Sequence, residues 1–164
     1  MACPNRTIGR GADVPKFSAD QVAAVLAIKQ AIYEWGDELD IHNGRTMKER
    51  DCLTTDVQYN VGGEWRDGID AVVGFYTMRL EQQQEAGAVM CMRHFITNLK
   101  VSFTSASHAK ADFLLLFFAK PGDPPFVGDN QPLASADVWM ECARSDDGDW
   151  RISRFDSTQI FIKG

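Results

Sequence analysis

The chain has 164 residues, of which 45% are hydrophobic and 24% charged, and its formal net charge is -6. This composition is typical of one globular domain with a sizeable core. The acidic balance and the lack of a basic stripe argue against nucleic acid, because phosphate binding requires clustered Lys and Arg. The longest apolar run, residues 113–119, is too short to cross a bilayer, and residues 1–17 lack the apolar segment of a secretory signal. We therefore expect a cytoplasmic protein without membrane or nucleic-acid partners.

The first half of the sequence predicts helices and a short hairpin. Residues 1–17 are predicted to form a flexible arm, and residues 18–164 a single domain. Ser18 and Gln21 have the spacing of a capping box, and apolar residues then recur at intervals of three and four up to Asp40. His42-Asn43-Gly44 predicts the end of this helix. The elements expected next are a shorter helix at residues 46–53, strands at residues 57–61 and 64–66, and a second substantial helix at residues 69–85.

The second half changes to the pattern of strands. Four long segments are rich in Val, Ile, Phe and Trp: residues 93–103, 109–119, 133–144 and 150–162. The last two are separated by Asp-Asp-Gly-Asp, which is typical of a hairpin turn. Helices followed by an antiparallel meander predict an α+β fold, with the helices packed on one face of a curved sheet.

The motif inventory indicates chemistry without a cofactor. Cys3, Cys52, Cys91 and Cys142 form no CxxC pair, so we expect reduced thiols. No cluster of His and Cys has the spacing of metal ligands, and neither a phosphate-binding loop nor a GxSxG elbow occurs. We therefore expect no metal and no cofactor.

Among the three histidines, His94 is the candidate for catalysis. It begins an apolar strand, so one of its faces must point into the fold. Helical periodicity places Asp40 on or beside the apolar stripe of the first helix, whereas Asp37 is expected to face solvent. A carboxylate that orients an imidazole makes an effective general base near neutral pH. The alternatives are a hydrogen-bonded core histidine and an aspartate at a frayed helix end.

The strand at residues 133–144 supplies further polar candidates. Ser135, Asp137 and Trp139 share one parity and are expected to line the cavity if the other parity faces outward. An ordinary strand serine is the alternative for Ser135. Asp is disfavoured inside strands, so Asp137 indicates a function or an edge position.

The motifs around these residues resemble those of a known family. The segment from Ile32 to Asp40, with Tyr33-Glu-Trp35 inside it, resembles the first-helix motif of scytalone dehydratases, in which a catalytic aspartate follows at the same distance. Tyr59 and His94 match an active-site tyrosine and the catalytic histidine of that family. The run from His94 to Lys100 also resembles the histidine strand of hexachlorocyclohexane dehydrochlorinases. Both families belong to the SnoaL-like group, and the resemblance spans residues 18–160.

This resemblance implies a fold and an activity. The fold would be a cone-shaped, curved, mixed β-sheet packed against N-terminal helices, of the cystatin-like, nuclear-transport-factor-like type. The activity would be that of a cofactor-independent lyase, with catalytic His94, Asp40 and Tyr59. Two sets of residues are expected around a small aromatic or cyclic substrate: substrate-binding Tyr33, Trp35, Ser135, Asp137, Trp139 and Phe155, and further lining residues Phe75 and Phe113. The resemblance also implies a homo-oligomer, with a trimer favoured.

The sequence departs from the scytalone dehydratase pattern at three places. Leu39 stands where the family has a tyrosine, residues 115–120 contain no second histidine, and Asp137 replaces an asparagine. The groups that polarise the substrate therefore differ, and scytalone is not the expected substrate. Dehydration is the first choice of reaction, and retro-aldol cleavage or isomerisation would use the same base. The alternatives of other classes are a non-catalytic module like a dioxygenase small subunit and a polyketide cyclase.

Overall fold

The computed structural model describes the chain except for residues 1–16, 129 and 164, so most of the expected N-terminal arm lies outside the described residues. The described elements are α1 (Ala19–His42), β1 (Leu53–Val61), β2 (Glu64–Asp67), α2 (Ile69–Glu85), β3 (Met90–Phe103), β4 (His108–Pro121), β5 (Ala134–Arg144) and β6 (Trp150–Ile162). Neither helix in this part of the chain combines the length and the apolar character needed to cross a membrane.

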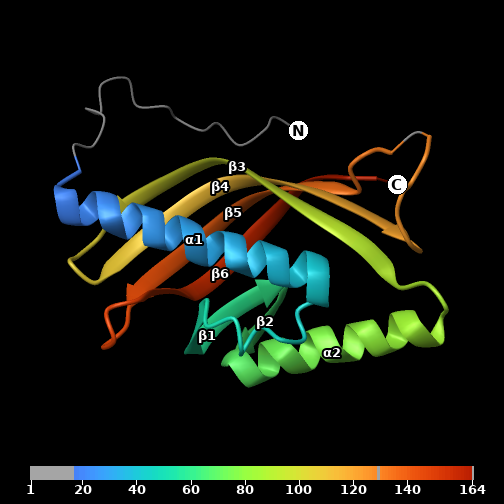
Figure 1. The fold of residues 1–164 in the computed structure, drawn as a ribbon, viewed down its shortest axis with the longest axis horizontal. Coiled ribbons are helices and arrows are strands. Elements are labelled where there is room, and N and C mark those ends of the chain that lie inside the picture. The colour runs from blue at the N-terminus through green and yellow to red at the C-terminus, as the bar shows by residue number, and fades with distance from the viewer. Residues whose placement is uncertain (1–16, 129, 164) are drawn as a thin grey trace.

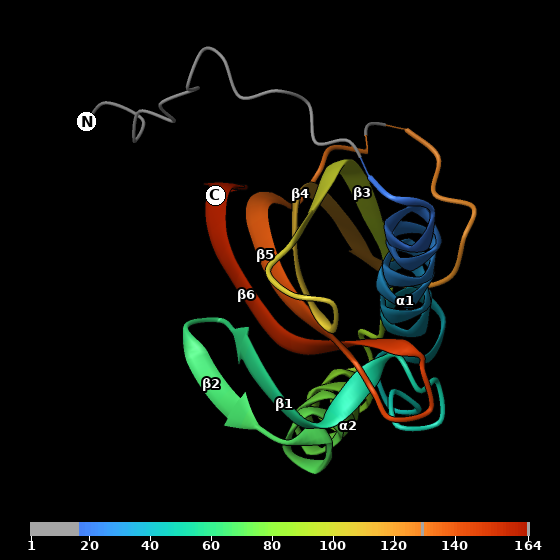
Figure 2. The ribbon, with the colours of Figure 1, turned by 90° about the vertical axis from the view of Figure 1, so that its left-hand side faces the viewer.

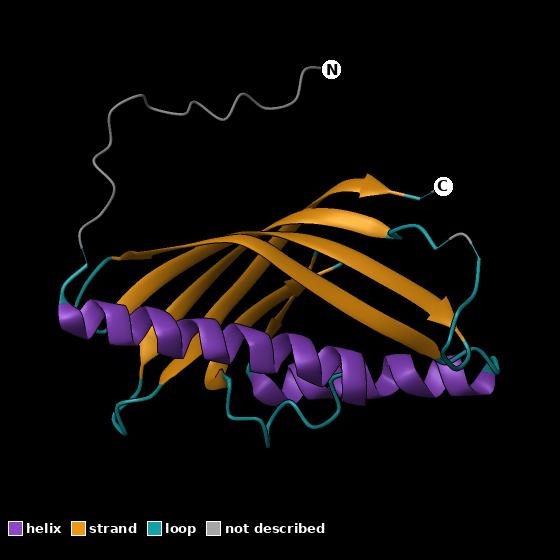
Figure 3. Cartoon of the chain, turned by 45° about the horizontal axis from the view of Figure 1, so that its top comes forward, coloured by secondary structure: helices purple, strands orange, loops and turns teal. Residues whose placement is uncertain are grey.

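The strands form one six-stranded sheet in the order β2-β1-β6-β5-β4-β3. Strands β3 to β6 make the antiparallel meander that the sequence predicts, and β1 joins β6 in parallel, so the sheet is mixed. Figure 1 shows α1 crossing the long strands, with α2 beside the β1–β2 end. Figure 2 shows how strongly the sheet curves, and Figure 3 shows both helices on the same side of it. The α+β class and the curved mixed sheet are confirmed.

Helix α1 is fixed at both ends by its own sequence. The capping box is formed: the Gln21 amide N–H donates to the Ser18 hydroxyl at 3.2 Å, and the Ser18 N–H donates to the Gln21 side chain at 3.0 Å. At the other end, Asn43 adopts the left-handed conformation, with φ of 56°. Ile28, Ile32, Trp35 and Leu39 are buried against the sheet, whereas Val22, part of the predicted apolar stripe, is exposed.

The short helix expected at residues 46–53 is absent, which corrects the prediction. Residues 43–51 form consecutive turns, and β1 begins at Leu53. The cause is Glu38, a fully buried carboxylate that accepts the Thr46 amide N–H and the Thr46 hydroxyl, each at 2.7 Å, and the Arg50 Nε–H at 3.1 Å. These bonds wrap the segment around one side chain, so its polar groups are satisfied without helical hydrogen bonds.

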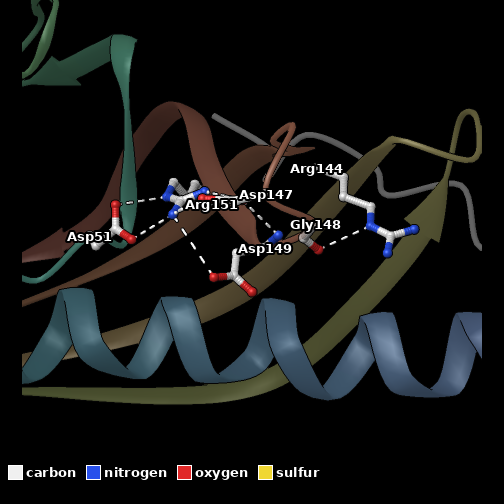
Figure 4. A network of polar contacts seen from close by, with 6 residues as sticks. All are labelled: Asp51, Arg144, Asp147, Gly148, Asp149 and Arg151. Atoms are coloured by element: carbon white, nitrogen blue, oxygen red, sulfur yellow. Dashed lines mark hydrogen bonds and ion pairs between the residues drawn. The ribbon is translucent and has the colours of Figure 1, made fainter.

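A second ion network joins the β5–β6 turn to the start of β1. The Arg151 guanidinium donates to Asp51 at 2.8 and 2.5 Å and to Asp147 at 2.9 and 2.7 Å. Figure 4 shows Arg151 between these two side chains. Arg151 itself is buried. The predicted Asp-Gly hairpin is present, closed by the Ser145 amide N–H and the Asp149 carbonyl at 2.9 Å, with Gly148 at positive φ. The network holds together two segments about a hundred residues apart in sequence.

Candidate active site

A cavity lies between the two helices and the concave face of the sheet. Its volume is about 170 Å³. The lining residues come from both helices and from five strands: Trp35, Leu39, Asn43, Tyr59, Val61, Tyr76, Arg79, Leu80, Gln83, Met92, His94, Leu115, Phe117, Ala134, Ser135, Ala136, Phe155, Ser157 and Gln159. Most of these side chains are apolar or aromatic, with a smaller number of polar side chains among them, which is the usual composition of a site for a small organic molecule.

Asp40 and His94 meet at the wall of this cavity. Asp40 lies in the last turn of α1, and His94 lies on β3. The Asp40 Oδ1 lies 2.6 Å from His94 Nδ1, and Asp40 Oδ2 accepts the backbone N–H of His94 at 3.0 Å. Each side chain is only 11% exposed, so the contact is shielded from water. The hydrogen bond expected from the sequence is therefore present, and the catalytic roles of the two residues remain a prediction.

The Asp40 contact determines which nitrogen of His94 is available. An ionised carboxylate can only accept hydrogen bonds, so Nδ1 carries the hydrogen that is shared with Asp40. The other ring nitrogen, Nε2, keeps its lone pair and is left as the basic atom of a residue that lines the cavity. The second bond of Asp40, to the backbone of the same residue, fixes the carboxylate relative to the strand and thereby fixes the imidazole.

Aromatic side chains hold the imidazole ring from two sides. Phe117, the partner of His94 in the β3–β4 register, lies with its ring centroid 4.7 Å from the imidazole. Trp35 makes an edge contact with a centroid distance of 5.8 Å. Both residues line the cavity, so the basic nitrogen sits in an apolar frame from which bulk water is largely displaced.

A chain of hydrogen bonds crosses the floor of the cavity. The Trp35 indole N–H donates to the Tyr59 hydroxyl at 2.9 Å, and the hydroxyls of Tyr59 and Tyr76 are 2.9 Å apart. Burial raises the pKa of Tyr59 well above its usual range, and Tyr76 and Trp35 modify it further. Burial also raises the pKa of Tyr76, against the opposing effects of the Tyr59 hydrogen bond and of Arg79. The two phenols are therefore neutral hydrogen-bond donors and not bases at physiological pH.

The packing around these phenols is tight. Tyr59 stacks on Phe155 with centroids 4.5 Å apart, and Phe155 also contacts Trp35 at 5.2 Å. On the other side, Gly44 adopts positive φ, and a Cβ at this position would lie 2.5 Å from the Tyr76 ring. Only glycine permits the turn after α1 to approach this ring so closely. The close approach fixes the position of Tyr76 on α2.

Several residues expected at the site lie elsewhere. Trp35, Tyr59, His94, Ser135 and Phe155 line the cavity as predicted. Tyr33, Asp137 and Trp139 do not line it, and Tyr33 and Trp139 are each 40% exposed. Phe75 packs instead under the guanidinium of Arg66, and Phe113 is buried in the core away from the lining.

The error on β5 concerns the choice of face. The alternation of side chains was predicted correctly, but Ala136, Val138 and Met140 are the buried set that faces the helices. Asp137 and Trp139 therefore point to the outer face of the sheet. Ser135 nevertheless lines the cavity, together with its neighbours Ala134 and Ala136 near the start of β5.

The sequence reasoning missed the contribution of helix α2. Tyr76, Arg79, Leu80 and Gln83 all line the cavity. Their spacing of three, one and three residues places them on one helical face, which is a signal that the sequence contained. The fold was needed to show that this face covers the cavity.

None of the cysteines in the described part of the chain lines this cavity. Cys52 and Cys142 are buried, and burial raises the pKa of each thiol to about 12. Cys91 has the opposite strand parity to His94 and lies in a different pocket, on the outer face. Within the part of the chain that the structure describes, no three His, Cys, Asp or Glu side chains are grouped as metal ligands.

Comparison with known protein families identifies the family to which this chain is similar. The SnoaL-like domain model matches residues 20–156. No match is found among curated proteins. A structure from Novosphingobium aromaticivorans designated a scytalone dehydratase superposes with a TM-score of 0.68 and 14% identity, covering 88% of this chain and 89% of that one.

Two further structures are similar to the same extent. Hexachlorocyclohexane dehydrochlorinase LinA-type3 from Novosphingobium barchaimii has a TM-score of 0.67 and 19% identity, covering 88% of this chain and 91% of that one. A nuclear-transport-factor-like protein with a cystatin-like fold from Novosphingobium aromaticivorans has a TM-score of 0.64 and 18% identity, covering 87% and 90%. These similarities establish the type of fold that the sequence resemblance implied.

Proposed function

The chain belongs to the SnoaL-like domain family, and from this premise we propose that it is a cofactor-independent lyase acting on a small cyclic or aromatic molecule. The observation that carries the proposal is the 2.6 Å contact between Asp40 Oδ1 and His94 Nδ1 at the wall of the cavity. Burial of a carboxylate beside an imidazole costs desolvation free energy, and a purely structural subunit would have no function that requires such a pair.

The proposed reaction is the elimination of water. His94 Nε2 removes a proton from the carbon next to the one that carries the hydroxyl, the double bond forms between the two carbons, and the C–O bond breaks. The leaving oxygen takes up the proton that His94 Nε2 has removed from the carbon and departs as water, which returns the imidazole to its neutral form. Asp40 keeps the imidazole in the required tautomer and offsets the positive charge of the imidazolium. Proton transfer by a positioned histidine contributes about 10²–10⁴-fold to rate in general acid–base catalysis.

The phenols are proposed to stabilise negative charge as it develops on the substrate. Tyr59 receives the Trp35 N–H and shares a hydrogen bond with Tyr76, so the pair can present one phenolic hydrogen to an oxygen in the cavity. Because they are buried and neutral, these donors require little reorganisation during the reaction. Ser135 is proposed as a further polar contact for substrate.

The cavity volume favours a substrate of one ring over a polyketide. An apolar protein cavity of about 150 Å³ is large enough to hold benzene, and the cavity here measures about 170 Å³. A flat molecule of several fused rings would need more space than this, so a cyclase of polyketides is the weaker proposal. Retro-aldol cleavage and isomerisation of a one-ring substrate are compatible with the same base.

The proposal can be tested with a panel of one-ring alcohols and β-hydroxy carbonyl compounds. Water loss creates a conjugated double bond, which is followed by ultraviolet absorbance and checked by mass spectrometry. The wild-type protein should convert at least one member of the panel, and His94→Ala should leave it unchanged over the same time. Conversion by both proteins at the same rate would contradict the proposal.

A further inference from the structure

Among the described residues, Arg79 is the one permanently charged side chain that lines the cavity. The described lining residues include no Asp or Glu, although the chain as a whole has 23 acidic residues against 17 Lys and Arg. Arg79 lies one turn after Tyr76 on α2, on the helical face that covers the cavity, and its own surface is exposed. It therefore stands at the opening, with its guanidinium reachable from both the cavity and the solvent.

No carboxylate in the described part of the chain pairs with the guanidinium of Arg79. Arg50 pairs with Glu38, and Arg151 pairs with Asp51 and Asp147. Among the residues that the structure describes, no ion pair or hydrogen bond is formed by Arg79. Its charge reaches the Tyr76 hydroxyl, where it opposes the effect of burial on the phenol pKa.

Another polar side chain of the cavity lining has an atom without a partner among the described residues. The side-chain oxygen of Asn43 is buried and accepts no hydrogen bond from the described residues, and Asn43 lines the same cavity. Asn43 is the C-cap of α1, three residues after Asp40, and it adjoins Gly44, which packs on Tyr76. This oxygen is an acceptor, so it matches a donor such as a hydroxyl group of the substrate and not the carboxylate itself.

We propose that the substrate is a carboxylate, bound through its anionic group by Arg79 at the opening while its ring lies towards His94. This inference rests on the proposed function and specifies its substrate class. The planar guanidinium matches the two oxygens of a carboxylate. The lining offers no second permanent cation for the higher charge of a phosphate monoester. Asp40 carries a negative charge next to His94, so Coulomb repulsion favours a position of the substrate carboxylate near Arg79 over one near His94.

The test uses binding, with benzoate as the probe and benzamide as its neutral counterpart of nearly equal size. Isothermal titration calorimetry at low salt should show that the wild-type protein prefers benzoate. Arg79→Gln should weaken benzoate binding about fivefold to tenfold, with little change for benzamide, and Arg79→Lys should fall between the two. Raising the salt to about 1 M should reduce the preference for benzoate. Arg45→Gln is the matched control, because Arg45 is exposed, does not line the cavity and carries the same charge.

Three results would overturn the inference: undetectable binding of benzoate, equal affinity for the two probes, or unchanged benzoate binding in Arg79→Gln. Because no turnover is measured, the outcome is separate from that of the lyase proposal. Charge-selective binding in a protein without lyase activity would contradict only the lyase proposal. Lyase activity without charge-selective binding would contradict only the assignment of Arg79.

Discussion

The carboxylate of Asp40 binds His94 through both of its oxygens, one at 2.6 Å from the ring Nδ1 and the other at 3.0 Å from the backbone N–H. The first contact sets the tautomer of the imidazole, and the second ties the end of α1 to β3. The Asp40 side chain therefore joins α1 to the sheet at the position of the proposed base, His94.

The two buried phenols should contribute to rate and not to substrate binding. Tyr59→Phe and Tyr76→Phe each remove a hydroxyl from the chain of hydrogen bonds that starts at Trp35. We expect each change to lower kcat by about 10²–10³-fold with a small effect on KM, as for the loss of one donor at a developing oxyanion. Steady-state kinetics check this. Thr77→Val, on the same helix but outside the cavity lining, should retain normal kcat. A loss expressed only in KM would assign the phenols to ground-state binding.

Activity should rise with pH and then stay high into the alkaline range. The imidazole must be neutral to accept a proton, so the rate should increase with pH as the protonated form of the base disappears. Burial raises the pKa of both phenols, so they keep their hydrogens beyond the pH at which exposed tyrosines ionise. A profile of kcat against pH measures both features. A fall of kcat below pH 9 that Tyr59→Phe abolishes would show that a phenol ionises earlier than its burial permits.

Stability should fall at acid pH through the Arg151 network. Hydrogen bonds from Arg151 lower the pKa of Asp147 to about 2 and that of Asp51 below its usual value. Because these pKa values are lower in the folded state, the carboxylates stabilise the fold above about pH 4, and this contribution is lost as pH falls towards 2. Urea unfolding at pH 6 and pH 3 measures the difference. Asp147→Asn should reduce it, whereas Asp146→Asn, in the same turn, should not. Equal pH dependence in all three proteins would contradict this account.

The protein should self-associate through the outer face of its sheet, with a trimer as the favoured state. Phe95 and Leu116 are neighbours in the β3–β4 register and are 55% and 39% exposed, and Trp139 is 40% exposed on β5. An apolar face of this kind is usually covered in solution. Light scattering at micromolar concentration should give a mass well above that of one chain, and Leu116→Glu should lower it. A monomer mass for the wild-type protein would refute the prediction.

A chelator should not change the rate. The proposed steps use only the side chains of His94, Asp40 and the phenols, so EDTA at millimolar concentration should leave turnover as it was. If EDTA inhibited the enzyme and one specific divalent ion restored its activity, a different mechanism would be required.

The Asp40–His94 pair was predictable because each residue had a local signal. The helical phase placed Asp40 close to the apolar stripe, and His94 began an apolar strand. The Tyr-Glu-Trp motif then linked the two through a family resemblance. By contrast, Tyr33 shares the Asp40 side of the helix and is exposed, because Asp40 lies at the margin of the buried stripe and only its carboxylate reaches inward.

The contribution of α2 and the orientation of β5 were decided by tertiary structure. Tyr76 and Arg79 lie on a regular helical face, but the strands that line the cavity with them are distant in sequence. The sequence therefore did not show which surface this helical face covers. On β5, both sets of alternating side chains contain apolar residues, so the pattern alone did not distinguish the inner face from the outer face. The turns at residues 43–51 depend on one buried carboxylate, Glu38, whose partners follow it in the chain and could not be inferred from spacing.

Asp40→Asn should lower kcat by about 10³–10⁴-fold while the protein remains folded, because an amide can stabilise the wrong tautomer and cannot offset the imidazolium charge. Circular dichroism and the unfolding midpoint establish that the fold is retained. Asp37→Asn is the matched control, since Asp37 lies on the same helix and faces solvent. A normal rate in Asp40→Asn would show that the pair has a structural role only.

Exchange of the abstracted proton tests the role of His94 most directly. A substrate that the wild-type protein converts is incubated in deuterated water with the wild-type protein or with His94→Ala. Nuclear magnetic resonance then follows the replacement of hydrogen by deuterium at the carbon next to the hydroxyl-bearing carbon. With the wild-type protein, the C–H signal of the substrate should disappear through exchange or elimination. With folded His94→Ala, the same signal should persist. Loss of the signal at the wild-type rate in folded His94→Ala would contradict the assignment of His94 as the base.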